Sequence, residues 1–247
     1  MGWFKQLMGL EAPNANKTAS PDLPVSGPLG LASGKQVMFD ATLKLLLDGN
    51  SAVVIPGSQQ IWSLGIVDLG QSNWLSRCYM NDEDYWLQVH TSGDVAGQVE
   101  SVILFNYLSY VTINSEAELR RLAGPESLIG LPTYTHEGAE YTREWGSEAG
   151  QTELVTLSER VSNPQESYNV EHRSMLYARD TGLTDRREFL LFSVEEDAEG
   201  TVSLSTSLGI SYRVKNNQFL YDISCAFSKQ HSWGLLKTPY ILAHEQA

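Results

Sequence analysis

The amino-acid sequence predicts an α+β fold that is predominantly antiparallel β, with many short strands, two or three short helices and a tethered N-terminal amphipathic helix. Three observations favour it. Runs of Val, Ile, Tyr, Trp and Thr alternate with turn residues along most of the chain, two segments carry helix-capping residues, and the first ten residues place apolar side chains at helical spacing. A chain of 247 residues, 42% of them hydrophobic, can bury a core without disulfides or metal ions.

Residues 1–10 form an amphipathic segment. On a helix, Trp3, Leu7 and Leu10 fall on one side, with Phe4 and Met8 beside them. Residues 11–24 hold three prolines and few aliphatic side chains, which is typical of a flexible linker. We therefore expect the segment to dock on a partner protein, on a membrane surface or on its own domain.

The globular body is expected to span residues 25–247. Asp40 is a helix N-cap and Gly49 a stop signal, so a short helix should lie between them. Ser115 and Glu118 form a capping box for a second helix, which should end at Gly124. If the body has two lobes, their boundary is expected near residues 124–132.

The other expected elements are strands, each a β-rich run between turn signals. They are Ala52–Ile55, Ile61–Asp68, Trp74–Met80, Tyr85–Thr91, Val99–Ile113, Thr133–Thr135, Ala139–Trp145, Glu153–Val161, Tyr168–Arg179, Arg187–Glu195, Thr201–Tyr212 and Gln218–Phe227.

Composition excludes several classes of function. The 17 basic and 30 acidic residues give a net charge of −13 and form no basic cluster, which argues against non-specific nucleic-acid binding. Apolar runs fall far short of the roughly 20 residues that span a bilayer. The N-terminus lacks the pattern of a secretory signal, and Cys78 and Cys225 show no metal-type spacing. These features predict a cytoplasmic protein, either free or peripheral to the inner membrane.

The segment Trp74–Thr91 is expected to form a hairpin. If Met80 pairs with Tyr85, one side of the hairpin carries Cys78 opposite Leu87 and is mostly apolar. The other side is polar and aromatic, and carries Arg77, Tyr79, Trp86 and Gln88.

Arginines flanked by aromatic residues recur on two later strands. Tyr141, Arg143 and Trp145 share a face, as do Tyr177 and Arg179. Such an arginine can stack on the rings and still offer its planar fork to a carboxylate or phosphate. One interpretation makes the residues of all three strands a ligand or partner face; the other is that a neighbouring acid neutralises each arginine on the sheet surface.

The sequence predicts no catalytic residue, metal site or cofactor site. His136 and Glu140 lack the second histidine of a zinc helix, His172 stands alone on a strand, and residues 27–36 lack the P-loop spacing. A catalytic group assembled from distant strands would leave no such pattern. Asp82 and Asp84 in the hairpin turn are a candidate cation loop, with a solvated turn as the alternative.

An ordered set of short motifs resembles the YjfK-like family of uncharacterised bacterial proteins. The motifs are Pro28–Leu31, Val67–Gly70, Arg77 and Tyr79 followed by Asp82, Asp84 and Trp86–Gln88, then Tyr141, Arg143 and Trp145, then Met175–Arg179 and Glu188–Leu191. The resemblance supplies no catalytic residues. It implies an accessory protein encoded near a phage-shock-protein-A-like membrane-stress protein, small membrane proteins and an enzyme similar to glutathionylspermidine synthase.

The expected function is therefore that of a cytoplasmic accessory or adaptor protein without enzymatic activity. It would dock on a membrane-stress partner or on the inner membrane surface through Trp3, Phe4, Leu7, Met8 and Leu10. The alternative is a binding protein or enzyme acting on a polyamine or a glutathione-related small molecule.

Overall fold

A computed structural model describes residues 26–146, 148–197, 200–212, 214–215, 218–219 and 223–226. The helical elements are η1 (Pro28–Gly30), α2 (Ala41–Leu47) and α3 (Glu116–Ala123). The strands are β1 (Gln36–Phe39), β2 (Gln59–Gly70), β3 (Asn73–Met80), β4 (Tyr85–Ser92), β5 (Gln98–Ile113), β6 (Thr133–His136), β7 (Ala139–Arg143), β8 (Val155–Ser162), β9 (Ser167–Asp180), β10 (Arg187–Glu196), β11 (Val202–Tyr212), β12 (Val214–Lys215), β13 (Gln218–Phe219) and β14 (Ile223–Ala226).

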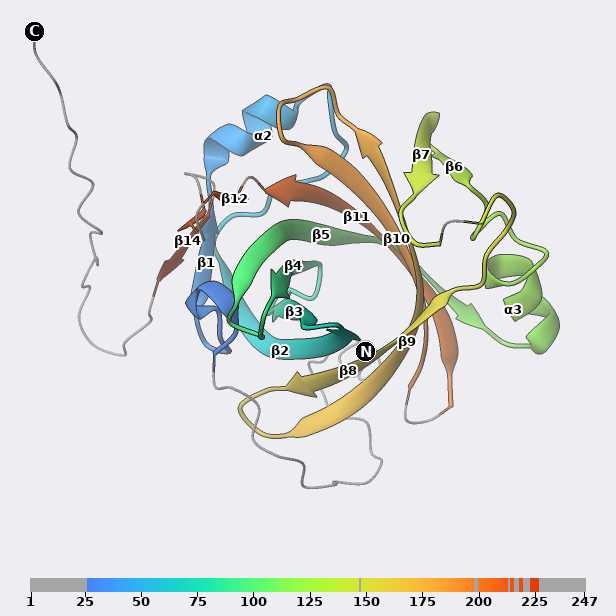
Figure 1. Cartoon of the computed structure of the whole chain (residues 1–247), viewed down its shortest axis with the longest axis horizontal. Coiled ribbons are helices and arrows are strands. Elements are labelled where there is room, and N and C mark those ends of the chain that lie inside the picture. Colours follow the sequence, from blue (N-terminus) through green and yellow to red (C-terminus); the bar gives the residue numbers. More distant parts are fainter. Residues whose placement is uncertain are drawn as a thin grey trace, which may run out of the picture.

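Eight antiparallel strands close into a barrel (Figure 1). Their order is β2, β3, β4, β5, β11, β10, β9 and β8, and the ring closes because β8 pairs with both β9 and β2. The β1–β14 pair extends the sheet from β2 beside β8, and the β6–β7 hairpin extends it from β9. Strands that precede and follow residues 124–132 thus lie in one sheet.

The expected α+β class is wrong, because the protein is a β-barrel with little helix. In the described residues the α-helices are only seven and eight residues long, whereas the barrel strands run from 8 to 16 residues. Capping residues marked the starts of both helices, but closure of the strands into a barrel depends on pairings between distant segments, such as that of β8 with β2.

Side chains along each barrel strand point alternately into the barrel interior and toward the outer face, which other segments cover. On β10, Phe189, Leu191, Ser193 and Glu195 face the barrel interior, and the residues between them face outward. On β11 the interior positions opposite them are Gly209, Ser207, Ser205 and Ser203. Small polar side chains on one strand therefore leave space for larger interior groups from the others.

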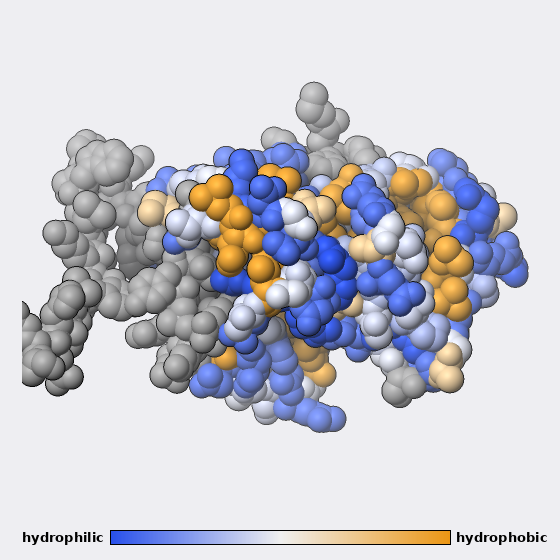
Figure 2. Space-filling view, turned by 90° about the horizontal axis from the view of Figure 1, so that it is seen from above, coloured by the Kyte–Doolittle hydropathy of each residue, from blue (hydrophilic) through white to orange (hydrophobic). Residues whose placement is uncertain are grey.

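Segments outside the barrel cover much of its apolar outer surface. On one side β1 and α2 pack against the wall, with the rings of Phe39 and Tyr212 6.2 Å apart. The β6–β7 hairpin lies on another side of the barrel (Figure 1). Tyr134 of β6 packs there on Phe192, with ring centroids 4.8 Å apart. On the face shown in Figure 2, the remaining apolar surface forms several separate areas among polar side chains.

The predicted helix starts and the hairpin register are confirmed. Asp40 accepts a hydrogen bond from Thr42 N at the start of α2, and Ser115 accepts one from Glu118 N at the start of α3. In the hairpin Arg77 lies opposite Gln88, as the alternation predicted. The strand predicted over Ala52–Ile55 is wrong, because this stretch is a loop in which Ala52 N donates to the Glu188 carboxylate.

None of the helices in the described part of the chain is long and apolar enough to cross a membrane.

Candidate functional site

A buried charged network lies inside the barrel. Glu159 Oε2 on β8 is 2.7 Å from Arg77 Nη1 on β3 and 2.8 Å from His172 Nε2 on β9. His172 Nδ1 is 2.8 Å from Glu195 Oε1 on β10, and the Tyr79 hydroxyl donates to Glu159 at 3.0 Å. We call these five residues the interior network; it links four strands of the wall.

A glycine on β2 makes room for this network. Gly65 lies between Arg77 on β3 and Val161 on β8 in the sheet register. A Cβ atom at this position would overlap the Glu159 carboxylate. Because Gly65 has no side chain, Glu159 can reach across β2 to Arg77.

The network holds two positive and two negative charges at neutral pH. Burial would raise the pKa of Glu159, but the Arg77 and His172 charges outweigh it and lower this pKa to about 2. Burial would lower the pKa of His172, but Glu195 and Glu159 outweigh it and raise this pKa to about 9. The imidazolium and the Arg77 guanidinium therefore balance the two carboxylates.

The interior network is enclosed by the barrel wall in this structure. Glu159 is 1% exposed and His172 3% exposed, and a carboxylate occupies each imidazole nitrogen. Proton transfer requires a reacting atom within hydrogen-bond reach of the imidazole. The network instead cross-links the wall of the barrel.

The nine residues of the predicted ligand face lie in different places. Arg77, Tyr79, Trp86 and Gln88 are all buried in the barrel interior, where Arg77 Cζ lies 5.2 Å from the centroid of the Trp86 ring and Arg77 Nε donates to Gln88 Oε1. Their ligand-binding role stays a prediction.

Two residues of that face meet at Glu188 on β10, outside the barrel interior. Arg179 Nε donates to Glu188 Oε1 at 2.6 Å, and Tyr141 and Ser51 also donate to this carboxylate. Burial would raise the pKa of Glu188, but its hydrogen bonds with Arg179 and these hydroxyls outweigh it and lower the pKa. The carboxylate thereby joins β7, β9 and the loop after α2.

Arg143, Tyr177 and Trp145 support loops near one side of the barrel. Arg143 donates to the carbonyl groups of Gly130, Glu148 and Gly150. Tyr177 accepts from Gly130 N at 2.7 Å and donates to a neighbouring carbonyl. Trp145 packs on apolar side chains, including those of Val67, Leu75 and Leu157. These contacts fix the two loops that precede β6 and β8.

The structure describes the residues of the predicted cation loop but not those of the predicted docking segment. Asp82 and Asp84 lie in the β3–β4 turn, where Asp84 N donates to Asp82 Oδ1. Partial burial and the Asp84 charge raise the pKa of Asp82, and its backbone hydrogen bonds oppose the rise. Among the described residues, no group of three or more His, Cys, Asp or Glu side chains could hold a metal ion. Trp3, Phe4, Leu7, Met8 and Leu10 lie outside those residues.

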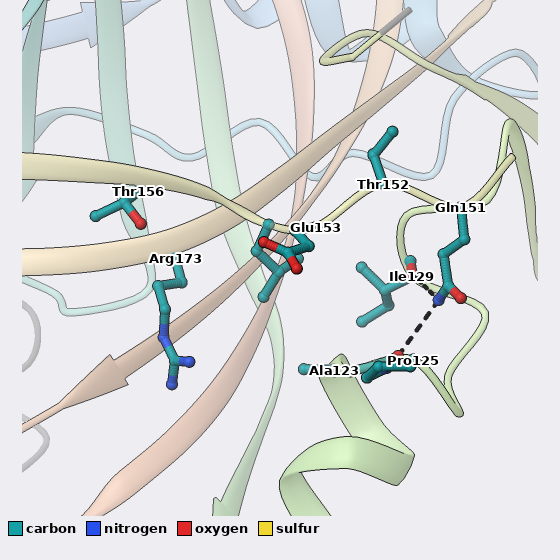
Figure 3. A pocket seen from close by; sticks show the side chains of 10 residues that line it. Ala123, Pro125, Ile129, Gln151, Thr152, Glu153, Thr156 and Arg173 are labelled. Atoms are coloured by element: carbon teal, nitrogen blue, oxygen red, sulfur yellow. Dashed lines mark hydrogen bonds between the residues drawn. The ribbon is translucent and has the colours of Figure 1, made fainter. Parts of the chain in front are cut away.

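A pocket of about 440 Å³ lies on the outside of the barrel, between the end of α3 and strands β8 and β9 (Figure 3). Its wall on the barrel side comes from the start of β8 and from Arg173 on β9. Its other walls are the end of α3 and the loops before β6 and β8. The lining residues are Ala123, Gly124, Pro125, Ile129, Gln151, Thr152, Glu153, Leu154, Thr156 and Arg173.

Hydrogen bonds to backbone carbonyl groups hold the loops of this pocket in place. Gln151 Nε2 donates to Gly124 O at 3.3 Å, Ser127 O at 3.0 Å and Ile129 O at 2.8 Å. Thr152 N donates to Gly130 O at 2.9 Å. The pocket therefore has walls that are connected to one another before any ligand binds.

Sequence reasoning missed Glu153 and Arg173 as candidate site residues. Arg173 directly follows His172, and alternation along β9 sends His172 into the barrel and Arg173 outward. No local motif marks the pair, because α3 and the loop before β6, which complete the pocket, lie far from β9 in the sequence.

A family model described as "Protein of unknown function (DUF2491)" matches residues 3–217. No curated protein and no solved structure matches the chain. Because the family match covers most of the sequence and includes all eight barrel strands, the chain belongs to this uncharacterised family, DUF2491.

Proposed function

We propose that the protein is a cytoplasmic, non-enzymatic adaptor that docks on a membrane-stress partner protein through residues 1–10. The observation that carries this proposal is the apolar stripe of Trp3, Leu7 and Leu10, which the proline-containing residues 11–24 separate from the body. The resemblance to the YjfK-like family suggests a membrane-stress protein as the partner, and this identity is part of the proposal.

The physical chemistry of the segment favours weak and reversible docking. Burying a large apolar side chain contributes about 1.5–3 kcal/mol, and five such side chains are available. Ordering a short helix opposes this gain, because helices of this length are marginal in water. A protein groove is favoured over anionic lipid, since the chain carries a net charge of −13 and the segment contains only Lys5 as a basic residue.

The barrel supports this proposal as a scaffold. Its interior cluster of Glu159, His172 and Glu195 is buried, and the charges of this cluster are paired. The body can then present the docking segment while its own charged groups serve stability.

The test compares proteins that co-purify with C-terminally tagged versions of the full chain from the native host in mild detergent. A Trp3→Glu/Leu7→Glu variant should lose a membrane-stress partner that the unaltered chain retains, because the charges abolish the apolar stripe. A Lys5→Gln variant is the matched control and should retain the partner. The proposal fails if the unaltered chain brings down no such partner, or if the double variant retains it.

The alternative candidate is a binding protein or enzyme acting on a polyamine or a glutathione-related small molecule. The observation that favours the polyamine version is the pair of acidic side chains in the β3–β4 turn. Partial burial and, to a smaller extent, the Asp84 charge raise the pKa of Asp82, and a bound cation would relieve the repulsion between the two carboxylates. Spermidine should then raise the melting temperature at physiological salt, and Asp82→Ala/Asp84→Ala should abolish the rise. An unchanged melting temperature across a polyamine series would exclude that version.

A further inference from the structure

We infer that the pocket between α3 and β8–β9 binds a small zwitterion with an apolar body, the chemical class of amino acids and short peptides. This ligand site is separate from the proposed docking segment and from the acidic turn at Asp82. The inference rests on two opposite charges, on the apolar part of the lining and on the fixed loops.

The two charged residues of the pocket have no partner within the described part of the chain. Arg173 and Glu153 are both exposed, and no hydrogen bond or ion pair engages either side chain there. This contrasts with Arg77 and Arg179, which are each held by a glutamate. Figure 3 shows Glu153 and Arg173 extending from the same wall with their charged groups apart.

The positions of these charges suit a ligand that carries both signs. The Arg173 guanidinium offers a planar pair of donors for a carboxylate, and Glu153 can accept from an ammonium group. The end of α3 adds to the preference for an ammonium group nearby, because the partial charge of a helix C-terminus is negative. A simple anion would leave Glu153 unpaired, and a polyamine would face Arg173.

The rest of the lining suits an apolar body of modest size. Ala123, Pro125, Ile129 and Leu154 contribute apolar surface, and the volume of about 440 Å³ falls within the usual range for small-molecule sites. An amino acid with an aliphatic side chain, or a dipeptide, has the matching combination of charges and apolar surface.

The loops of the pocket are fixed in advance of binding. Arg143 and Gln151 together bind carbonyl groups of both loops. Gly130 adopts a φ of 91° and packs against Thr152 O, where a Cβ atom would clash. A ligand therefore meets a loop backbone that is already ordered, which lowers the entropic cost of binding.

Isothermal titration calorimetry with leucine and leucyl-leucine tests the inference on the full chain. We expect saturable binding of at least one of them. Isoamylamine, which has only the ammonium group, and 4-methylpentanoate, which has only the carboxylate, should bind about tenfold more weakly or worse, because each forfeits one charge-assisted contact. The inference fails if neither zwitterion binds, or if a single-charge analogue binds as well.

Variants locate the binding in this pocket. Arg173→Gln and Glu153→Gln should each weaken binding about tenfold, and Thr156→Trp should abolish it by filling the pocket from an exposed strand position. Glu171→Gln, on the outer face of β9 but outside the pocket, is the matched control and should bind like the unaltered chain. Unchanged affinity in Arg173→Gln, at an unchanged melting temperature, would overturn the assignment.

Discussion

At the scale of single residues, Glu159 on β8 connects β3 with β9 through the barrel interior. It is paired with Arg77 and His172 and accepts from Tyr79, and it is 1% exposed. Replacing it would leave two buried cations without their common counter-charge. Removing one member of a buried ion pair is strongly destabilising for this reason.

We therefore predict that Glu159→Gln lowers the free energy of unfolding by about 3 kcal/mol, as is typical when a buried charge loses its partner. Urea denaturation measures the loss. Glu171→Gln, on the outer face of the adjacent strand β9, should change the free energy by less than about 0.5 kcal/mol. Equal, small losses in the two variants would contradict the structural role of the interior network.

The pKa of His172 predicts how stability depends on pH. Its value of about 9 in the folded protein lies above the ordinary 6.5, so the protonated imidazole stabilises the fold. That contribution is complete below about pH 6.5 and is lost as the pH rises through 9. The free energy of unfolding should therefore fall between these pH values.

His172→Asn should remove most of this dependence, although it also lowers stability overall. Urea denaturation at pH 6.5, 8 and 9 measures the slope for both proteins. His136→Asn, in β6 outside the barrel, is the control for changing a histidine elsewhere. A slope that is the same in His172→Asn and in the unaltered chain would show that another group causes it.

At the scale of secondary-structure elements, close approach across β2 depends on Gly65. A Cβ atom there would overlap Glu159, and a side chain at Gly209 on β11 would similarly lie 2.6 Å from Phe105. Both glycines therefore occupy strand positions over which a larger interior side chain passes. From the sequence alone, each glycine would be expected only to weaken its strand.

Gly65→Ala should lower the free energy of unfolding by about 1–3 kcal/mol, because the new methyl group displaces Glu159 from its partners. Chemical denaturation compares it with Gly57→Ala, where an added Cβ atom meets nothing within 4 Å. A stabilised Gly65→Ala protein would show that Glu159 does not cross β2 as described.

Local sequence patterns predicted the elements better than their assembly. Alternation gave the pairing of Arg77 with Gln88, and capping residues gave the starts of α2 and α3, because these depend on neighbours in the chain. Closure of the barrel depends on the β8–β2 pairing, whose strands are almost a hundred residues apart, and no local pattern encodes it.

The same limit applies to the candidate sites. Alternation placed Arg77, Tyr79 and Trp86 on one face, but it could not show that this face is the barrel interior. The Arg77–Glu159 contact joins residues 82 positions apart. Arg173 and the end of α3 likewise meet only through the tertiary fold.

At the scale of the whole molecule, the charges divide into two groups. The interior network balances its own charges, so the acidic net charge of the chain lies in the residues outside it. In this account the body is stabilised from within, and its contacts with other molecules are made by the surface pocket and by the N-terminal segment.

The proposed separation between body and docking segment is tested most directly by the melting temperature of the chain without residues 1–10. If the segment docks on a partner, its removal should leave the melting temperature within about 1 °C of that of the full chain. If Trp3, Leu7 and Leu10 instead pack on the body, their loss should lower it by several degrees, since about 1 kcal/mol corresponds to about 2–4 °C in a protein of this size. That fall would contradict the account.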